Sequence, residues 1–228
     1  MEKIMEKNIL IRDIETKNIM TKSSLPVGGY SVNPYVGCTH GCKYCYASFM
    51  KRFTGHTESW GTFLDITHWP AIHNPRKYKG QRVVIGSVTD GYLPQEKEIR
   101  NTRRILEQLK NSGAEILICT KSDLVLRDID LLKEMGKVTV SCAINPLDEK
   151  VQADMDQAVS ISRRLEAIKQ VYEAGIRTVC FISPVFPGIT DFEKIFERVK
   201  DQCDLVWLEN LNLRGGFKQE ILDYIQKC

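Results

Sequence analysis

Short apolar runs rich in valine and isoleucine alternate with segments of helical spacing from residue 31 onward. An apolar run of roughly four to eight residues predicts a buried β-strand, whereas apolar positions at steps of three and four predict an amphipathic helix. Six strands are predicted in this way, over residues 31–36, 82–88, 115–120, 137–143, 177–183 and 205–211. The pattern therefore indicates a chain built from repeated strand–helix units.

Helical spacing fills most of the gaps between these strands. Helices are predicted over residues 99–109, 124–135, 161–172, 192–199 and 217–227. Thr190-Asp191-Phe192-Glu193 has the sequence of a capping box, which marks the start of the fourth of these helices. Residues 46–81 and 144–160 interrupt the alternation.

Strict alternation of strands and helices predicts an α/β fold with a parallel sheet covered by helices. Six units are too few for a closed eight-stranded barrel, so the pattern leaves a partial barrel or a doubly wound sheet. No linker or repeat divides the chain, which predicts a single domain. Residues 1–30, of mixed charge, are expected to form a leader packed on the core of residues 31–228.

Composition adds little to this picture. Hydrophobic residues make up 43% and charged residues 27% of the 228 residues, as in an ordinary globular protein. The net charge of +3 is too small to indicate nucleic acid or a membrane surface by itself. The N-terminal segment has no apolar signal core and no apolar run is long enough to span a bilayer, so we predict a cytoplasmic protein.

The cysteines carry the clearest chemical signal. Three of the eight, Cys38, Cys42 and Cys45, lie within eight residues, with three and then two residues between them. Three thiolates in one loop can bind three corners of a 4Fe–4S cluster and leave the fourth iron open. A structural zinc site would need a fourth ligand, for which His40 or a distant cysteine is available, and usually a second cysteine pair, which is absent. Three merely structural cysteines are the remaining alternative.

This spacing, with Tyr44 just before the last cysteine, resembles the signature of the radical S-adenosylmethionine (SAM) enzymes. Within them the chain is most similar to the spore photoproduct lyase-like branch, over about residues 18–200. A short subgroup of radical SAM proteins encoded in pairs on mobile elements is similar in length. The segments that carry the resemblance are residues 33–38, 45–47, 89–94, 120–122 and 164–167.

The resemblance implies a partial (β/α)6 barrel with two cofactors, a 4Fe–4S cluster on the three cysteines and SAM on the open iron. In this family an electron from the cluster cleaves SAM to methionine and a 5′-deoxyadenosyl radical, which abstracts a hydrogen atom from the substrate. The residues that match SAM-contacting positions are Tyr44, Thr89, Lys121, Ser141 and Arg164.

Each of these matches has an ordinary structural alternative. Tyr44 would pack near the adenine, or simply fill the mouth of the barrel. Thr89 and Ser141 would contact SAM, or satisfy backbone groups at strand ends. Lys121 would find a carboxylate or hydroxyl partner, or extend to the surface. Arg164 could pair with the SAM carboxylate, or belong to a solvated helix face.

One position departs from the lyase pattern. The lyases have Cys-Thr-Ser-Asp after the second strand, and their cysteine donates a hydrogen atom, whereas this chain has Ser87-Val88-Thr89-Asp90. A serine O–H bond is too strong for that role, so another hydrogen source is needed. The remaining cysteines are expected to be core residues, apart from an exposed terminal one: Cys119, Cys142, Cys180, Cys203 and Cys228.

We therefore predict a radical SAM enzyme whose substrate is a nucleic-acid base, a protein or a peptide. Photoproduct-lyase-like DNA repair and a non-enzymatic iron–sulfur or zinc-bound module that binds a partner are the alternatives. The expected partners are a low-potential electron donor of the flavodoxin or ferredoxin type and, for the paired subgroup, a second radical SAM protein. A nucleic-acid substrate would suit the basic residues Lys51, Arg52, Arg76, Lys77, Lys79 and Arg82, which otherwise form a solvated loop.

Overall fold

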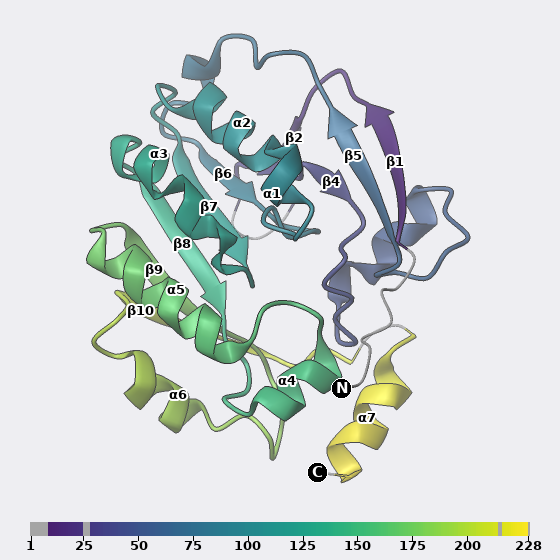
Figure 1. Ribbon diagram of the computed structural model, residues 1–228. Coiled ribbons are helices and arrows are strands. Elements are labelled where there is room, and N and C mark those ends of the chain that lie inside the picture. The colour runs from purple at the N-terminus through teal and green to yellow at the C-terminus, as the bar shows by residue number, and fades with distance from the viewer. Residues whose placement is uncertain (1–8, 25–27, 214–215, 228) are drawn as a thin grey trace.

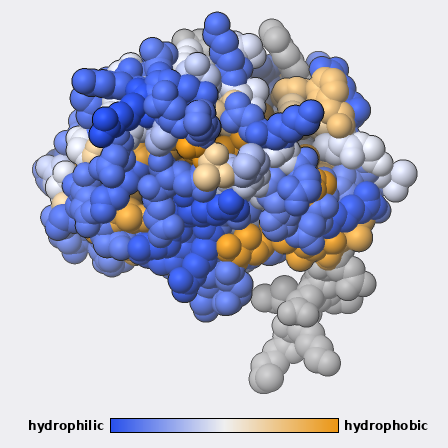
Figure 2. All heavy atoms as spheres, turned by 90° about the horizontal axis from the view of Figure 1, so that it is seen from above, coloured by the Kyte–Doolittle hydropathy of each residue, from blue (hydrophilic) through white to orange (hydrophobic). Residues whose placement is uncertain are grey.

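The computed structural model describes residues 9–24, 28–213 and 216–227. Within them the chain forms a seven-stranded sheet and a three-stranded sheet, with helices along the outer side of the larger one (Figure 1). Seen from above, the surface is mainly hydrophilic, with hydrophobic side chains gathered in small separate areas (Figure 2). Among the described residues, none of the helices has the length and apolar composition that crossing a membrane requires. The cytoplasmic location stays a prediction.

The larger sheet contains the six predicted strands in parallel. Its order is β10-β9-β8-β7-β6-β3-β2, and all pairs are parallel except β2–β3 at one edge. This confirms the predicted α/β fold with a parallel sheet. The strands are β2 (Met20–Lys22), β3 (Tyr30–Val32), β6 (Arg82–Ile85), β7 (Glu115–Thr120), β8 (Val138–Ala143), β9 (Arg177–Val185) and β10 (Leu205–Asn210).

The first predicted strand is split between the two sheets. Residues 31–36 form β3 and, after Asn33-Pro34, the short strand β4 (Tyr35–Val36). Pro34 has no N–H to donate, and its carbonyl accepts a hydrogen bond from the Thr67 amide at 3.2 Å. β4 then pairs antiparallel with β5 (Phe63–His68), which pairs parallel with β1 (Leu10–Glu15). One proline thus directs the chain from one sheet to the other.

The predicted leader contributes a strand to each sheet. β1 and β2 both come from residues 1–30, and the hydrophobic pattern indicated neither. β5 lies within the interruption at residues 46–81 and was also missed. Residues 1–8 and 25–27 of the leader lie outside the described part of the chain. The division into a leader and a core domain stays a prediction.

Helices connect successive strands of the larger sheet. Isoleucines of three of them, Ile105, Ile168 and Ile195, are fully buried in one core with the sheet residues Ile118 and Val140. The helices are α1 (Glu96–Ile99), α2 (Asn101–Leu109), α3 (Ile129–Glu134), α4 (Glu149–Met155), α5 (Ile161–Glu173), α6 (Phe192–Val199) and α7 (Lys218–Lys227), with the 3₁₀-helices η1 (Tyr46–Phe53), η2 (Pro75–Tyr78) and η3 (Asp123–Asp128).

The predicted capping box is wrong in one detail. α6 begins where expected, but the residue that caps it is Asp191, whose carboxylate accepts a hydrogen bond from the Lys194 amide at 3.0 Å. The Thr190 hydroxyl instead accepts from the Phe186 amide and donates to the Asn145 carbonyl, both at 2.8 Å. Thr190 therefore ties the end of β9 to the loop after β8.

Candidate functional site

The cysteine loop, residues 37–45, follows β4 and is fixed on two sides by long-range contacts. On one side the Thr89 hydroxyl donates to the Gly37 carbonyl at 2.6 Å, beyond the end of β6. On the other, the Lys43 amide donates to the Met155 carbonyl at 2.9 Å, at the end of α4. The carboxyl ends of the parallel strands, where α/β folds carry their chemistry, thus meet the cysteines.

Glycine allows the loop to approach its support closely. Gly37 has φ of +92°, and a Cβ there would lie 2.5 Å from the Phe63 carbonyl oxygen of β5. A Cβ on Gly61 would lie 2.8 Å from Cα of Gly41, which itself has φ of +54°. Side chains at Gly37 or Gly61 would push the cysteine loop away from β5.

The three thiols of the loop share one environment. Cys38 is buried and Cys42 and Cys45 are half-buried, and none is in a disulfide. Burial raises the pKa of Cys38 to about 12, with smaller contributions from Asp90 and Cys45. Burial also raises the pKa of Cys42 well above its usual value; the Lys121 charge opposes this, and Cys38 and Cys45 add to it. The sulfurs are thus near enough to influence one another.

These cysteines fit an iron–sulfur cluster. Desolvated thiols that oppose ionisation become thiolates when a positively charged metal group binds them. Among the described residues, no group of three or more His, Cys, Asp or Glu side chains is arranged to hold a single metal ion. A 4Fe–4S cluster needs no such group, because each thiolate binds a different iron. His40, the fourth zinc ligand weighed from sequence, pairs with Asp90 through Nε2, and its buried Nδ1 has no hydrogen-bond partner among the described residues.

Asp90 is the centre of a buried hydrogen-bond network below the cysteine loop. Its carboxylate accepts from the Thr120 hydroxyl at 2.8 Å and the Lys121 amide at 2.7 Å, and pairs with His40 Nε2 at 3.0 Å. Burial acts to raise the pKa of Asp90, but His40 and the backbone donors outweigh it and hold that pKa below its usual range. Asp90 therefore links β6, β7 and the loop. The sequence pattern placed it at a strand end without selecting it.

Tyr44 is held by a second buried network. Its side chain packs edge-on against Phe186, and its hydroxyl donates to Asp156 at 2.9 Å. Asp156 also forms an ion pair with Arg164 at 2.5 Å. The Arg164 guanidinium donates in addition to the carbonyls of Val159 at 2.7 Å and Ala143 at 3.4 Å. Arg164 is thus surrounded by protein partners, and the SAM contact predicted for it stays a prediction.

Lys121 extends from the end of β7 toward the cysteine loop. Its ammonium lies 5.6 Å from the centre of the Tyr44 ring. Burial raises the pKa of Cys42 and Cys45, and the Lys121 charge opposes this. Burial also acts to raise the pKa of Asp156, but the charges of Arg164 and Lys121 outweigh it and that pKa is lowered. The structure therefore brings three of the predicted SAM-contacting residues, Tyr44, Thr89 and Lys121, to the loop.

Two polar side chains near the end of β8 have no protein partner. Ser141 and Asn145 are each 1% exposed. Within the described residues, the Ser141 hydroxyl and both polar atoms of the Asn145 side chain lack hydrogen bonds. Unsatisfied buried groups are costly, which makes these atoms suited to a bound ligand. Ser141 was among the predicted SAM contacts. Asn145, two residues after the end of β8, was not among them.

The cysteines outside the loop differ in exposure. Cys142, Cys180 and Cys203 are buried, as expected for core residues. Cys119 is only half-buried, and it is the register partner of Ser141 on the neighbouring strand. Since Val140 and Cys142 face the helices, Ser141 and Cys119 face the opposite side of the sheet. Cys228 lies outside the described residues.

Ser87 follows β6 near the start of η1. Its hydroxyl accepts from the Asn33 side chain at 3.0 Å, and its carbonyl accepts from the Tyr46 hydroxyl. Ser87 is therefore fixed between the two segments that border the cysteine loop.

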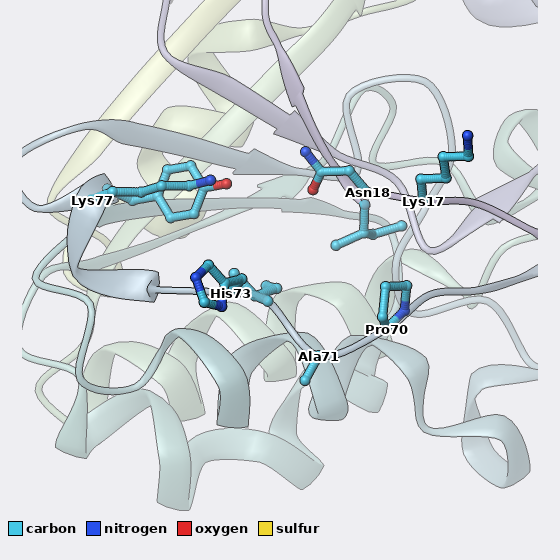
Figure 3. Close-up of a pocket in the computed structure, with 9 residues that line it drawn as sticks. Lys17, Asn18, Pro70, Ala71, His73 and Lys77 are labelled. Atoms are coloured by element: carbon cyan, nitrogen blue, oxygen red, sulfur yellow. The ribbon is translucent and has the colours of Figure 1, made fainter.

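A cavity of about 330 Å³ lies elsewhere, between the segments that link β1 to β2 and β5 to β6 (Figure 3). Lys17, His73 and Lys77 line it, together with the buried Tyr78. None of the predicted cluster-binding or SAM-contacting residues lines it.

Comparisons with known proteins agree with the cysteine spacing. Residues 32–199 match the family model described as the radical SAM superfamily. The chain is 34% identical over 225 residues to an uncharacterized protein of Methanocaldococcus jannaschii, covering 98% of this chain and 85% of that one. It is 25% identical over 180 residues to the radical SAM Nalpha-GlyT isomerase of Pseudomonas phage M6, covering 76% of this chain and 36% of that one.

Solved structures show the same fold. Spore photoproduct lyase with bound AdoMet and dinucleoside spore photoproduct has a TM-score of 0.71 at 14% identity, over 95% of this chain and 66% of that one. SuiB of Streptococcus suis, bound to S-adenosylmethionine, has a TM-score of 0.58 at 15% identity, over 86% of this chain and 46% of that one. These similarities confirm the fold, and the chain spans two thirds or less of both proteins.

Proposed function

The chain belongs to the radical SAM superfamily, and from this membership we propose that Cys38, Cys42 and Cys45 hold a 4Fe–4S cluster whose open iron binds SAM. When bound, the two cofactors supply a 5′-deoxyadenosyl radical that takes a hydrogen atom from the substrate. The observation that carries the proposal is the placement of three desolvated thiols on one loop, held at the carboxyl ends of the parallel strands. Membership of an enzyme superfamily does not support the alternative of a non-enzymatic binding module.

The loop contacts suggest how the chain would keep this site in shape. Asp90 joins the cysteine loop to β6 and β7 through His40 and the Lys121 amide. Asp156 holds Tyr44, which lies between the last two cysteines. Both carboxylates would fix the positions of the cysteines before any cofactor binds, and so reduce the ordering cost of binding.

Four residues would contact SAM directly. Lys121 supplies a positive charge beside the Tyr44 ring, and Thr89 keeps a hydroxyl oxygen free to accept a further hydrogen bond. The unpartnered Ser141 hydroxyl, to which we add Asn145, would satisfy its hydrogen-bonding capacity on the ligand. For Arg164 we propose an indirect contribution through Asp156 and Tyr44, because its guanidinium donates to three protein groups.

A modified nucleic-acid base is the substrate that we propose first. The spore photoproduct lyase structure that contains a dinucleoside has a higher TM-score, 0.71, than the SuiB structure bound to its precursor peptide, 0.57. A peptide is therefore the second candidate. Radical SAM enzymes need a reductant, for which we propose a flavodoxin or ferredoxin. A second radical SAM protein as partner stays a prediction.

Anaerobic reconstitution tests the cluster proposal. We expect about four irons per chain and production of methionine and 5′-deoxyadenosine from SAM with dithionite as reductant. Cys42→Ala should lose the visible absorbance and all SAM cleavage. Cys142→Ala, a buried cysteine on the helix side of β8, is the matched control and should keep both. Tight zinc binding without iron uptake would contradict the proposal.

A further inference from the structure

The 3₁₀-helix η1 begins directly after the cluster cysteine Cys45 and displays three exposed aromatic rings. Tyr46, Phe49 and Phe53 are 55%, 46% and 66% exposed. Residues three apart line up on a 3₁₀-helix, so Tyr46, Phe49 and Arg52 form one row. The Arg52 guanidinium lies 5.5 Å from the Phe49 ring centre and 4.6 Å from that of Phe53. We call these four residues, together with the neighbouring Lys51, the η1 surface. Three exposed aromatic rings gathered on one short helix mark an interaction site better than scattered apolar residues do.

The η1 surface is positively charged. Residues 46–53 contain Lys51 and Arg52 but no acidic residue. The Lys51 ammonium donates to the Thr57 carbonyl at 3.0 Å, and Arg52 stacks on the two phenylalanines. In the part of the chain that the structure describes, neither Lys51 nor Arg52 forms an ion pair with a carboxylate. Arg52 is exposed and Lys51 is partly exposed, so neither charge is neutralised by an acidic side chain.

This surface is also fixed in place at both ends. At its start, the Tyr46 hydroxyl donates to the Ser87 carbonyl. After its end, the buried His56 contacts Asp65 at 2.9 Å and Glu58 at 3.0 Å through its two ring nitrogens, and its ring stacks on Phe63. Asp65 and Phe63 belong to β5, so the segment that follows η1 is anchored on that strand. A preordered surface loses little entropy when a partner binds.

We infer that the η1 surface docks an acidic electron-transfer protein of the flavodoxin or ferredoxin type. The inference rests on the proposed cluster. Electron transfer slows steeply with distance, and η1 is the exposed element joined directly to a cluster cysteine. In the transfer, the donor loses one electron and the cluster gains it, with no bond formed or broken. Electron-transfer complexes use small interfaces guided by opposite charges, which a short aromatic and cationic helix can supply.

A nucleic-acid track is less well supported at this surface. Lys51 and Arg52 precede β5, whereas the cations Arg76, Lys77 and Lys79 follow it. β5, six residues or about 20 Å long, lies in the chain between the two groups. The basic patch predicted from sequence is therefore divided. A nucleic-acid backbone needs cations along a continuous path, while a docked protein needs a compact charged centre.

Binding of a purified acidic bacterial flavodoxin to the reconstituted enzyme tests the inference. We expect wild-type binding that weakens with added salt, and a dissociation constant at least about tenfold higher for the double variant Lys51→Glu/Arg52→Glu, measured by NMR titration of labelled flavodoxin. Arg76→Glu/Lys77→Glu makes the same change of charge beyond the far end of β5 and should bind like the wild type. Equal affinities for all three proteins would overturn the inference.

Two reductants separate this inference from the proposed function. With dithionite, Lys51→Glu/Arg52→Glu should cleave SAM as fast as the wild type. With limiting flavodoxin hydroquinone it should be at least about tenfold slower. If the wild type fails with dithionite, the proposed function is wrong, while the binding titration still tests docking. Lys51→Glu/Arg52→Glu could instead bind a single-stranded oligonucleotide more weakly than the wild type and bind flavodoxin equally well. That result would overturn the inference and make η1 a nucleic-acid contact.

Discussion

Asp156 and Arg164 form an ion pair whose side chains are 0% and 1% exposed, with Oδ1 and Nη2 2.5 Å apart. The second oxygen of Asp156 accepts the Tyr44 hydroxyl at 2.9 Å. A buried charge pair at the start of α5 therefore fixes the residue that precedes Cys45, the last of the three loop cysteines. The position of the cysteine loop depends on a charge balance in the core.

Asp156→Asn should destabilise the folded chain strongly. It leaves the Arg164 guanidinium buried without a counter-charge, which typically costs about 3–5 kcal/mol. Urea unfolding of the cofactor-free protein measures this loss. Tyr44→Phe removes only the hydroxyl that donates to the same carboxylate, and should lower the free energy of unfolding by about 1 kcal/mol. Equal small losses for both variants would show that the ion pair does not stabilise the fold.

Lys121→Ala should weaken SAM binding while leaving the cluster intact. A charge-assisted contact is worth about 1.5–3 kcal/mol, which corresponds to roughly 10- to 150-fold in affinity. Equilibrium binding of SAM to reconstituted protein checks the change, and iron content serves as the internal reference. Lys133→Ala removes an exposed lysine of α3 and should have no effect. An unchanged dissociation constant for Lys121→Ala would show that Lys121 does not contact SAM and extends to the surface instead.

The wild type should repair a spore photoproduct dinucleotide poorly or not at all. Ser87 cannot donate a hydrogen atom as a thiol does, and its hydroxyl is bonded to Asn33. Ser87→Cys should introduce or increase repair, measured as thymidine dinucleotide formed under anaerobic turnover. The same assay is run with Cys119→Ser as a control. The half-buried Cys119 is another thiol, on β7, the strand next to β6. Efficient repair by the wild type would restore lyase-like repair as the leading function.

Glu149→Gln should lower stability more at neutral pH than in acid. The Glu149 carboxylate accepts the Ile161 and Ser162 amides, both at 2.8 Å, at the start of α5. Burial acts to raise the pKa of Glu149, but these hydrogen bonds outweigh it and lower that pKa. A carboxylate whose pKa is lower in the folded than in the unfolded state stabilises the fold at pH values above its unfolded-state pKa. This stabilisation is lost as the pH falls through the folded-state pKa.

We expect a loss of about 1 kcal/mol at pH 7, since the site is exposed, and a smaller loss at about pH 3. Urea unfolding at the two pH values checks this. Glu166→Gln, on the exposed face of α5, should change stability little at either pH. A loss for Glu149→Gln that is the same at both pH values would contradict the electrostatic explanation.

Strands and helices with strong local patterns could be predicted from the sequence. β7 and α6 have the predicted bounds, since β7 is a run of buried apolar residues and α6 has a clear apolar face. β1 could not be predicted, because half of its residues are charged and it is largely exposed. Its stability comes from pairing with β5, which begins 53 residues after β1 does. Such a pairing leaves no local signal.

The residues of the candidate site also differ in whether the sequence could predict them. The spacing of the three cysteines is local, so it could be recognised before the fold was known. Asp156 lies 112 residues from Tyr44 and outside every predicted strand and helix, so nothing near it in the sequence indicates its contact with the loop. Asp90 had a weak signal, its place at a strand end, but its four hydrogen bonds depend on the folded sheet.

These distant partners set the order in which the protein can mature. The cysteine loop owes its shape to His40–Asp90 and Tyr44–Asp156 contacts that span 50 and 112 residues, and to backbone bonds with the segment after α4. Contacts so far apart in sequence form late, once the strands between them have assembled. A nascent chain therefore offers three thiols without a binding geometry. The proposed cluster would therefore be inserted after the strands around the loop have assembled.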